Sequence, residues 1–251
     1  MKDFYLTLPS RGDKNKISSF TVDLPYENNL NGTWEVGLVE VLYPTSWYNI
    51  HEGNNKVSIC YAGINDDTKL PHCYERETKS FCITVGFYDQ ATDVVQHLNR
   101  IMETFIKKRL PELGGFYVDD EGYVRYNKSF DCVMTIHQDI ADMLGHKDFM
   151  FGTHAKTAEM HPNFVMQNLY LYTDIIQPQI VGNVRAPLLA IIPAQERNLK
   201  PARYTTHLIQ YLPLQRHNFN SIHVNIRDVT GKHVAFASGH SVVKLHFRQQ
   251  K

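Results

Sequence analysis

Residues 222–232 read Ile-His-Val-Asn-Ile-Arg-Asp-Val-Thr-Gly-Lys, and this stretch decides the fold class. Ile222, Val224 and Ile226 alternate with polar residues, so a β-strand would place the apolar set on one face and the polar set on the other. The turn-forming residues that follow include Gly231, which can take the positive φ that a tight reversal often requires. We therefore predict a strand that is followed by a sharp turn.

The same alternation of apolar and polar residues recurs on both sides of that stretch. Residues 243–248 repeat it after the turn, and residues 18–24 show it near the N-terminus. Strand character returns in residues 169–176 and 188–192. These segments together predict antiparallel β-structure over much of the chain.

The stretch from Trp34 to Tyr43 carries an alternation whose phase changes. Its apolar residues fall at even positions up to Leu38 and at odd positions from Val39 onward. A one-residue shift of this kind is produced by a β-bulge, and a strand buried on both faces would give a similar pattern. We expect a strand with one of these two features, which ends at Pro44.

One segment has helical periodicity instead. Its apolar residues recur at the spacing of an amphipathic helix, which predicts a helix at about residues 91–109. These residues are Val94, Val95, Leu98, Ile101, Met102, Phe105 and Ile106. The surrounding expectations are a strand at 81–88, a hairpin at 116–126, a strand at 132–136 and a short helix at 139–144. We interpret residues 75–150 as an α+β insertion.

The fold class that follows is mainly β. About thirteen short strands with one long helix argue against a nucleotide-binding α/β fold, in which helices alternate with strands. A β-sandwich is the economical architecture. Residues 1–74 and 151–251 would form it as one discontinuous domain, interrupted by the insertion at 75–150, and residues 145–165 are expected to be a connecting loop.

Composition and charge exclude several classes of function. The 251 residues carry 26 Lys and Arg against 26 Asp and Glu, so the net charge of zero disfavours binding of nucleic acid through its phosphates. No segment approaches the roughly 20 apolar residues of a membrane span, and the N-terminus lacks the apolar segment of a signal peptide. We expect neither a membrane nor a specific nucleic acid as partner.

The four cysteines predict a reducing compartment. Cys60, Cys73, Cys82 and Cys132 include no CxxC pair, and their spacing does not resemble a disulfide framework. We expect them to be free thiols. A structural zinc site with His72 is disfavoured, because zinc thiolates normally come in close pairs.

Common sequence motifs of nucleotide-binding, zinc-peptidase and hydrolase sites are absent from the sequence. It contains no GxGxxG, GxxxxGK[ST], HExxH or GxSxG. The thirteen histidines include no pair at helical i, i+4 spacing on the predicted helix, which favours surface or interface roles over metal binding. Cys132 and His137 are five residues apart, which gives no reason for their side chains to meet as nucleophile and base. We predict no catalytic residues, no cofactor and no metal.

Three long stretches resemble the penton (minor capsid) proteins of Polinton/Maverick virus-like transposable elements. They are Thr33-Trp-Glu-Val-Gly-Leu-Val-Glu-Val-Leu-Tyr-Pro-Thr-Ser-Trp-Tyr-Asn49, then Leu171-Tyr-Thr-Asp-Ile-Ile-Gln-Pro-Gln-Ile-Val-Gly-Asn-Val-Arg-Ala-Pro-Leu-Leu189, and the C-terminal stretch from Phe219 through Ile226-Arg-Asp228 to Leu245-His-Phe-Arg248. Their order and spacing match that family from about residue 20 to the last few residues. Residues 51–165 show only weak similarity.

The resemblance implies a jelly-roll β-sandwich without catalytic residues. It implies a homopentamer at the fivefold vertices of an icosahedral virion, assembled with a double-jelly-roll major capsid protein. Such a capsid protein would be made in the reducing cytoplasm or nucleus of a eukaryotic host cell.

A candidate assembly loop lies at residues 177–187. Its two prolines and its glycine restrict the loop shape, and Arg185 offers a forked donor to a neighbouring subunit. We single out Gln179, Arg185 and Pro187 in this loop. The alternative is a wide sandwich loop whose arginine is satisfied within its own chain.

Two other functions stay open at the level of sequence. The fourteen tyrosines, thirteen phenylalanines and two tryptophans would suit a β-sandwich recognition module that binds glycans or host proteins. A hydrolase that uses Cys132 or a histidine is the third hypothesis, and no motif names its substrate.

Overall fold

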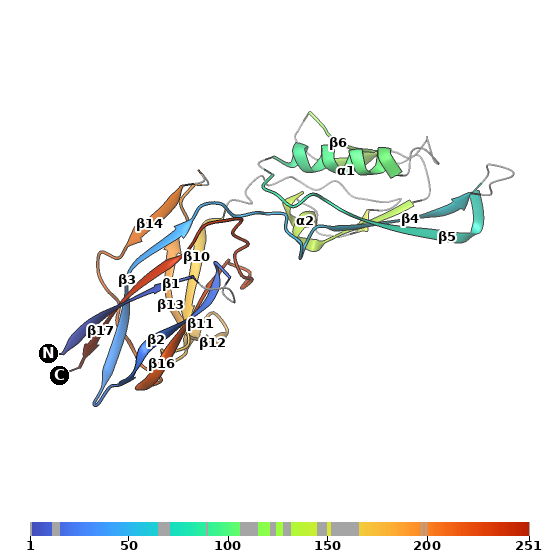
Figure 1. The fold of residues 1–251 in the computed structure, drawn as a ribbon. Helices are drawn as coiled ribbons and strands as arrows, with labels where there is room; N and C mark the ends of the chain where they lie inside the picture. The colour runs from blue at the N-terminus through green and yellow to red at the C-terminus, as the bar shows by residue number, and fades with distance from the viewer. Residues whose placement is uncertain are drawn as a thin grey trace. The chain divides into compact units, whose positions relative to one another are not determined.

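The computed structural model describes residues 2–11, 16–64, 71–88, 90–105, 115–120, 124–127, 132–144, 150–151, 166–196, 198 and 200–250. The chain divides into two compact units, and each has its own strands (Figure 1). The first unit comprises Met1–Trp47 and Met166–Lys251, and the second comprises Tyr48–Val165. The second unit is therefore an insertion in the first.

The first sheet of the first unit has four main strands in the spatial order β1-β17-β3-β14, and all neighbours are antiparallel. Their bounds are Asp3–Pro9 for β1, Val242–Gln249 for β17, Trp34–Pro44 for β3 and Pro201–Thr205 for β14. The short strand β15 (Leu212–Pro213) also pairs with β3. The inner strands of this sheet are thus β17 and β3.

The second sheet has the order β13-β10-β16-β2, and it is antiparallel as well. Its strands are β13 (Leu188–Pro193), β10 (Asn168–Thr173), β16 (Asn218–Arg227) and β2 (Ser19–Asn29). A separate two-stranded hairpin, β11 (Gln179–Val181) with β12 (Val184–Ala186), lies between β10 and β13 in the chain. The inner strands here are β10 and β16.

The chain runs between the two sheets in the order of a jelly roll. When these eight main strands are numbered along the chain, the first sheet contains the first, eighth, third and sixth. The second sheet contains the fifth, fourth, seventh and second. Two interleaved Greek keys of eight strands define the jelly-roll architecture, so the expected mainly β, jelly-roll β-sandwich is confirmed by the strand order.

Aromatic rings connect the two sheets in the core. The ring of Phe247 in β17 is fully buried, and it stacks on Phe4 of β1 with 4.8 Å between centroids. Phe219 of β16, in the opposite sheet, lies 5.9 Å from Phe247. Most residues that alternation placed inward are buried, and two of them, Val22 and Leu24 in β2, are half-buried. The buried ones are Phe20, Ile222, Val224, Ile226, Val243 and Leu245. Burial of these apolar side chains is the main stabilising term of such a sandwich.

A β-bulge accounts for the phase change in β3. Lys244 of β17 pairs with Glu40, and the next residue, Leu245, pairs with Leu38, so Val39 is the extra residue. The carbonyl oxygen of Val39 accepts a hydrogen bond from the amide of Thr206 at 2.9 Å. Of the two features that the sequence allowed, the structure therefore shows the bulge.

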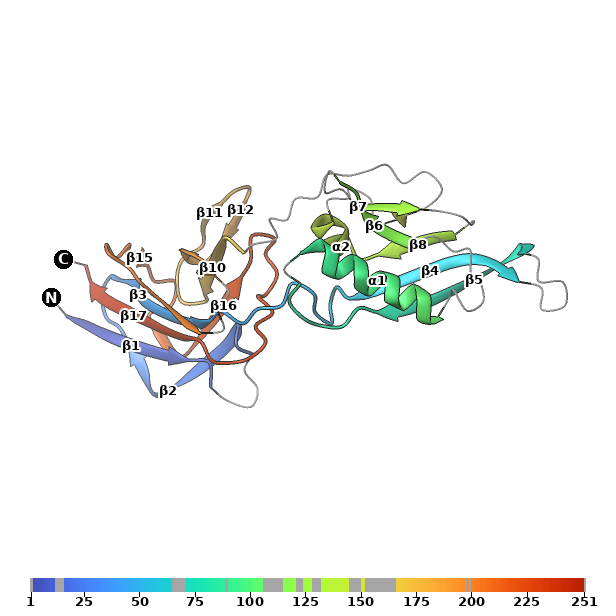
Figure 2. The same cartoon turned by 90° about the horizontal axis from the view of Figure 1, so that it is seen from above.

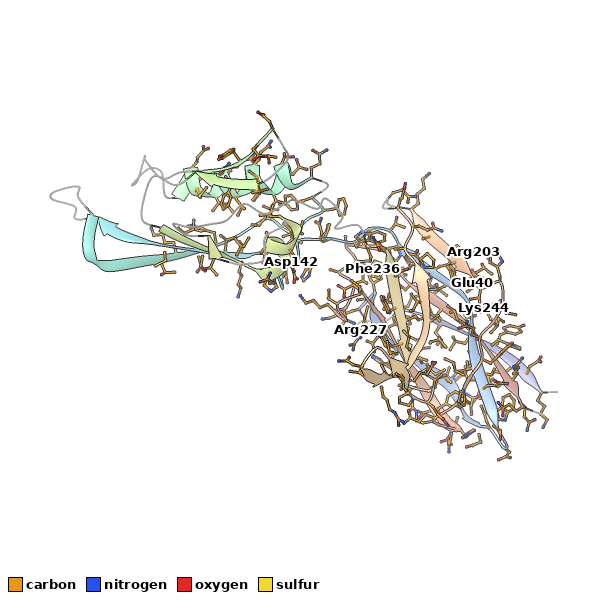
Figure 3. The ribbon with its side chains drawn as sticks, turned by 180° about the vertical axis from the view of Figure 1, so that it is seen from behind. Glu40, Asp142, Arg203, Arg227, Phe236 and Lys244 are labelled. Atoms are coloured by element: carbon orange, nitrogen blue, oxygen red, sulfur yellow. The ribbon has the colours of Figure 1, made fainter. Side chains whose placement is uncertain are left out.

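The bulge places Glu40 beside two cations. Arg203 of β14 donates from Nε to Glu40 Oε1 at 2.8 Å and from a second guanidinium nitrogen to Oε2 at 3.0 Å. Figure 3 shows Glu40 and Arg203 with Lys244 nearby. This forked pair links the edge strand β14 to the inner strand β3.

The second unit contains a sheet of order β5-β4-β8-β9. Its strands are β4 (Lys56–Ile64), β5 (Pro71–Cys82), β8 (Cys132–Ile136) and β9 (Met150–Phe151). Helix α1 (Ala91–Phe105), helix α2 (Gln138–Met143) and the hairpin of β6 (Gly115–Val118) and β7 (Val124–Asn127) complete the unit. The predicted hairpin, short helix and strand at 132–136 are thus confirmed. The amphipathic helix is confirmed over Ala91–Phe105, and its expected last residues, 106–109, lie outside the described residues.

The apolar face of α1 forms the centre of the core of this unit. Its buried side chains are Val94, Val95, Leu98, Ile101 and Met102, and they share one cluster with Val57, Ile59, Phe116, Ile136 and Ile140. This packing explains the helical periodicity, because only one stripe of α1 faces the sheet and the hairpin.

Two sequence expectations differ from the structure. The units divide after Trp47 and Val165, whereas the insertion was expected at 75–150, because β4 pairs with β5 and β8 and so belongs to the inserted sheet. The strand expected at 81–88 ends at Cys82, and beyond it only Gly86 forms an isolated bridge, with Ile50. Within the described residues seventeen strands occur, several of them only two to four residues long. Most of the loop expected at 145–165 lies outside those residues.

Candidate functional site

The loop that the sequence singled out for assembly is an ordered hairpin. Residues 177–187 contain β11 and β12, which pair in antiparallel register through Gln179 with Ala186, Ile180 with Arg185 and Val181 with Val184. Gly182 has a φ of 61°, the left-handed conformation that a two-residue hairpin turn demands. The dipeptide Gly182-Asn183 between apolar residues is the signal that predicts this turn, and the sequence interpretation as a loop overlooked it.

The base of the hairpin is held firmly. Gln177 donates from its amide to the carbonyl oxygen of Pro213 at 3.0 Å and from Nε2 to that of Leu214 at 3.3 Å. Ile175 and Ile176 immediately before it are fully buried, and Ile176 forms a bridge with Leu214. The hairpin therefore starts from the packed interior of the sandwich.

Two of the three singled-out residues help to close the base. Gln179 donates from Nε2 to the carbonyl oxygen of Leu188 at 2.7 Å, and the carbonyl oxygen of Pro187 accepts from the amide of Thr173 at 3.1 Å. Both contacts tie the hairpin to the ends of β10 and β13. Gln179 and Pro187 thus have roles inside the chain.

The tip of the hairpin is exposed and apolar. The exposed fraction is 79% for Ile180 and 56% for Val184. Both are among the most exposed large hydrophobic side chains of the described residues. Arg185 is exposed on the same face as Ile180, its cross-strand partner, and within the described part of the chain its side chain makes no hydrogen bond or ion pair. A rigid base with an exposed apolar tip and a cation is the composition of a protein-binding element.

Asp174 anchors the chain just before the hairpin. One carboxylate oxygen accepts a hydrogen bond from the amide of His223 at 2.9 Å, and the other accepts from Arg216 at 2.5 Å. Both side chains of the ion pair are about half-buried, with 41% exposure for Arg216 and 39% for Asp174. The pair fixes the end of β10 to β16 and to the segment after β15.

A second polar cluster lies on the first sheet. The ring of His246 in β17 stacks on Tyr5 at 4.4 Å, and its Nδ1 lies 2.7 Å from the hydroxyl of Tyr211. Arg248 covers the ring of Tyr211 at 3.4 Å and donates from Nε to Glu35 at 3.0 Å. The alternation at 243–248 places His246 on the polar face of its strand, yet it is only 8% exposed because the two tyrosines cover it.

A strap of residues 206–211 brings Tyr211 to that cluster. It crosses β3 at Gly37, where a Cβ atom would stand 2.3 Å from Ile209 Cγ2 and 2.6 Å from the carbonyl oxygen of Gln210. Glycine is therefore the residue that permits this close approach. The cluster of His246, Tyr211 and Arg248 holds the strap in place.

Tyr43 joins the two sheets at the end of β3. Its hydroxyl donates to the carbonyl oxygen of Pro193 at 3.2 Å and accepts from the amide of Gln195 at 3.1 Å. Burial raises the pKa of Tyr43 above 10.0, and the hydrogen bond from Gln195 opposes that rise. The neutral hydroxyl is thus a structural link.

Of the side chains weighed as catalytic or metal-binding, His137 has a structural role. His137 caps α2 by accepting from the amide of Asp139 at 3.2 Å, and the side chain of Cys132 lies outside the described residues, as does that of Cys73. Cys60 and Cys82 are free thiols. Among the described residues no group of three or more His, Cys, Asp or Glu side chains is arranged to hold a metal ion. None of the described helices is long and apolar enough to cross a membrane.

Comparisons with known proteins find similarity at the level of structure. No protein-family model matches the chain, and no curated protein matches it. Among solved structures, the crystal structure of the selenomethionine-labelled mavirus penton protein is similar, with a TM-score of 0.47 and 11% sequence identity over 99% of this chain and 100% of that chain. At this level of similarity the jelly-roll assignment rests on the strand order itself.

Proposed function

We propose that this chain is a structural capsid protein, the penton subunit that forms homopentamers at the fivefold vertices of an icosahedral virion. It would assemble there with a double-jelly-roll major capsid protein. The observation that carries the proposal is the jelly-roll order of the eight strands, an architecture of viral capsid domains. In this role the chain has no catalytic residues and needs no cofactor.

The three stretches that resemble Polinton/Maverick penton proteins support the proposal through their positions. The first stretch forms β3, and the third forms β16 and β17. The second contains the end of β10, the whole β11–β12 hairpin and the start of β13. The resemblance therefore covers the inner strands of both sheets, which build the core of the jelly roll.

The β11–β12 hairpin supplies a contact surface of the kind that assembly needs. A ring of identical subunits uses a head-to-tail contact, so each subunit must present at least one projecting patch to its neighbour. Ile180 and Val184 are exposed at the tip of an anchored hairpin, and Arg185 adds a charge on the face of Ile180. We assign Arg185 to the contact, while Gln179 and Pro187 hold the hairpin in shape.

Co-expression with the major capsid protein tests the proposal. Electron microscopy of the resulting particles should show this chain at the fivefold vertices. Particles that close without it, or that carry it elsewhere, would contradict the vertex role. A monomer in solution would not, because pentamers can require the shell as a template.

A β-sandwich recognition module is the competing function. Jelly rolls also occur in lectins, and the exposed rings of Tyr5 (56%) and Tyr26 (68%) favour that alternative. Binding to a glycan array that is lost on Tyr26→Ala or Tyr5→Ala would support it. The absence of binding to every glycan of the array at high protein concentration would exclude the recognition module.

A further inference from the structure

Strand β2 contains a protrusion at the edge of the second sheet. Asn28 pairs with Phe219 and Asp23 pairs with Ser221, so four residues of β2, 24–27, lie opposite the single residue Asn220. An insertion of this size pushes the chain out of the ladder and prevents a further strand from pairing there. We call residues 23–27 the β2 protrusion.

The β2 protrusion carries an exposed aromatic ring and two exposed acidic residues. Tyr26 is 68% exposed, and Asp23 and Glu27, which precede and follow it in the chain, are exposed as well. Within the described residues neither acid makes a hydrogen bond or an ion pair through its side chain. This composition is the complement of the hairpin tip, where Ile180 and the cation of Arg185 are cross-strand partners on one face.

The hairpin joins two strands at one side of the second sheet, and the β2 protrusion lies at the opposite edge of that sheet. The hairpin connects β10 with the edge strand β13, and β2 forms the other edge in the order β13-β10-β16-β2. Figure 2 shows the hairpin and β2 on opposite sides of the first unit. A head-to-tail ring needs two different, complementary patches on separate sides of each subunit, so this pair meets the geometric requirement.

We infer that the hairpin tip of one copy of this chain docks on the β2 protrusion of the next copy, with Ile180 against Tyr26 and Arg185 against Glu27 and Asp23. The inference rests on the proposed pentamer and names its contact. The apolar tip supplies the burial, and the opposite charges orient the approach and exclude wrong partners. The rest of the roughly 1,200 to 2,000 Å² that a stable contact buries would come from the surfaces around these two elements.

Cysteine cross-linking tests the contact in the full chain. Tyr26→Cys and Ile180→Cys change exposed side chains, so neither should disturb the fold. The two variants are mixed under mild oxidation, both in solution and on shells formed with the major capsid protein, and the linked peptides are identified by mass spectrometry. The mixture should give a dimer linked between positions 26 and 180, and neither variant alone should give that link.

An exchange of charges provides a second measurement. Arg185→Glu and Glu27→Arg should each weaken self-association about tenfold, and the double variant should recover most of it because attraction is restored. Lys200→Glu is the matched control, since Lys200 is an exposed cation outside both patches and should leave association unchanged.

The outcomes separate the contact from the function. Pentamers or occupied vertices without the 26–180 link, or single charge variants that assemble like the wild type, would overturn the contact and leave the vertex role standing. A chain that is absent from the shells, with no 26–180 link there or in solution, would overturn both. A link that forms in the mixture, together with recovery in the double charge variant, would establish the contact.

Discussion

Gly37 of β3 lies directly beneath Ile209 of the strap, so close that a Cβ atom at position 37 would stand 2.3 Å from Ile209 Cγ2. The same atom would stand 2.6 Å from the carbonyl oxygen of Gln210, which is backbone and cannot turn aside as a side chain can. The strap can therefore pack this closely on β3 only because residue 37 has no side chain. The strap in turn places Tyr211 on His246.

Gly37→Ala should lift the strap from β3. We expect a loss of about 1–3 kcal/mol in the free energy of unfolding, because the added methyl group overpacks a tight contact. Urea denaturation followed by tryptophan fluorescence measures it. Gly86→Ala is the control, since its Cβ would meet nothing nearer than Tyr88 Cε2 at 3.7 Å. Equal stability of the two variants would show that the strap is not held at Gly37.

Tyr211→Phe should destabilise the first unit by about 1–3 kcal/mol, because it removes the hydroxyl beside Nδ1 of a buried histidine. The other ring nitrogen of His246 already lacks a hydrogen-bond partner among the described residues. Tyr5→Phe is the matched control, because Tyr5 contacts the same ring by stacking and is 56% exposed. Thermal unfolding of both variants gives the comparison, and a Tyr5→Phe loss as large as that of Tyr211→Phe would refute the role of the hydroxyl.

Asp174→Asn and Asp174→Ala should differ. The amide oxygen of Asn can still accept from His223, but it leaves Arg216 without its charge partner, whereas Ala removes both contacts. We expect about 1 kcal/mol of destabilisation for Asn and about twice that for Ala, modest values because the pair is half-exposed. Denaturant titration checks the order, and hydrogen exchange at Val181 and Val184 should rise as the base of the hairpin loosens. The reverse order of stability would contradict this assignment.

The stability of the second unit should fall in mild acid because of His97. Burial, and then the charge of Arg100, lower the pKa of His97 below 6.5. The unfolded chain therefore takes up a proton before the folded chain does, so stability is complete above about pH 6.5 and declines as the pH falls from there toward the folded pKa. Unfolding temperatures between pH 8 and pH 5 measure the decline.

His97→Gln should reduce that decline, since glutamine does not titrate. The ring of His97 lies 3.2 Å from the Thr84 hydroxyl and edge-on to Tyr88, so glutamine retains a polar group near Thr84 and loses the aromatic contact. The variant is therefore expected to be less stable at every pH but to have a flatter pH profile. Parallel profiles of wild type and variant would exclude His97 as the titrating group.

The local elements of this protein follow from its sequence. The alternation at 222–226 and 243–247, the amphipathic stripe of α1 and the phase change at Val39 correspond to β16, β17, α1 and the bulge. These features can be predicted from neighbouring residues, because strand and helix periodicities are properties of short segments. The three stretches of family resemblance also predicted the jelly roll, and the sheet order agrees with it.

The tertiary structure alone decided which segments belong together. β4 lies within residues 1–74, which were expected in the sandwich, yet it joins the inserted sheet because its partners are β5 and β8. Pairing partners are not encoded in a strand's own pattern. The burial of His246 depends on Tyr5 and Tyr211, which lie far from it in the chain. The hairpin and the β2 protrusion likewise come to lie on opposite sides only when the second sheet forms. The order of the strands in that sheet decides this, and strand order depends on contacts between distant segments of the chain.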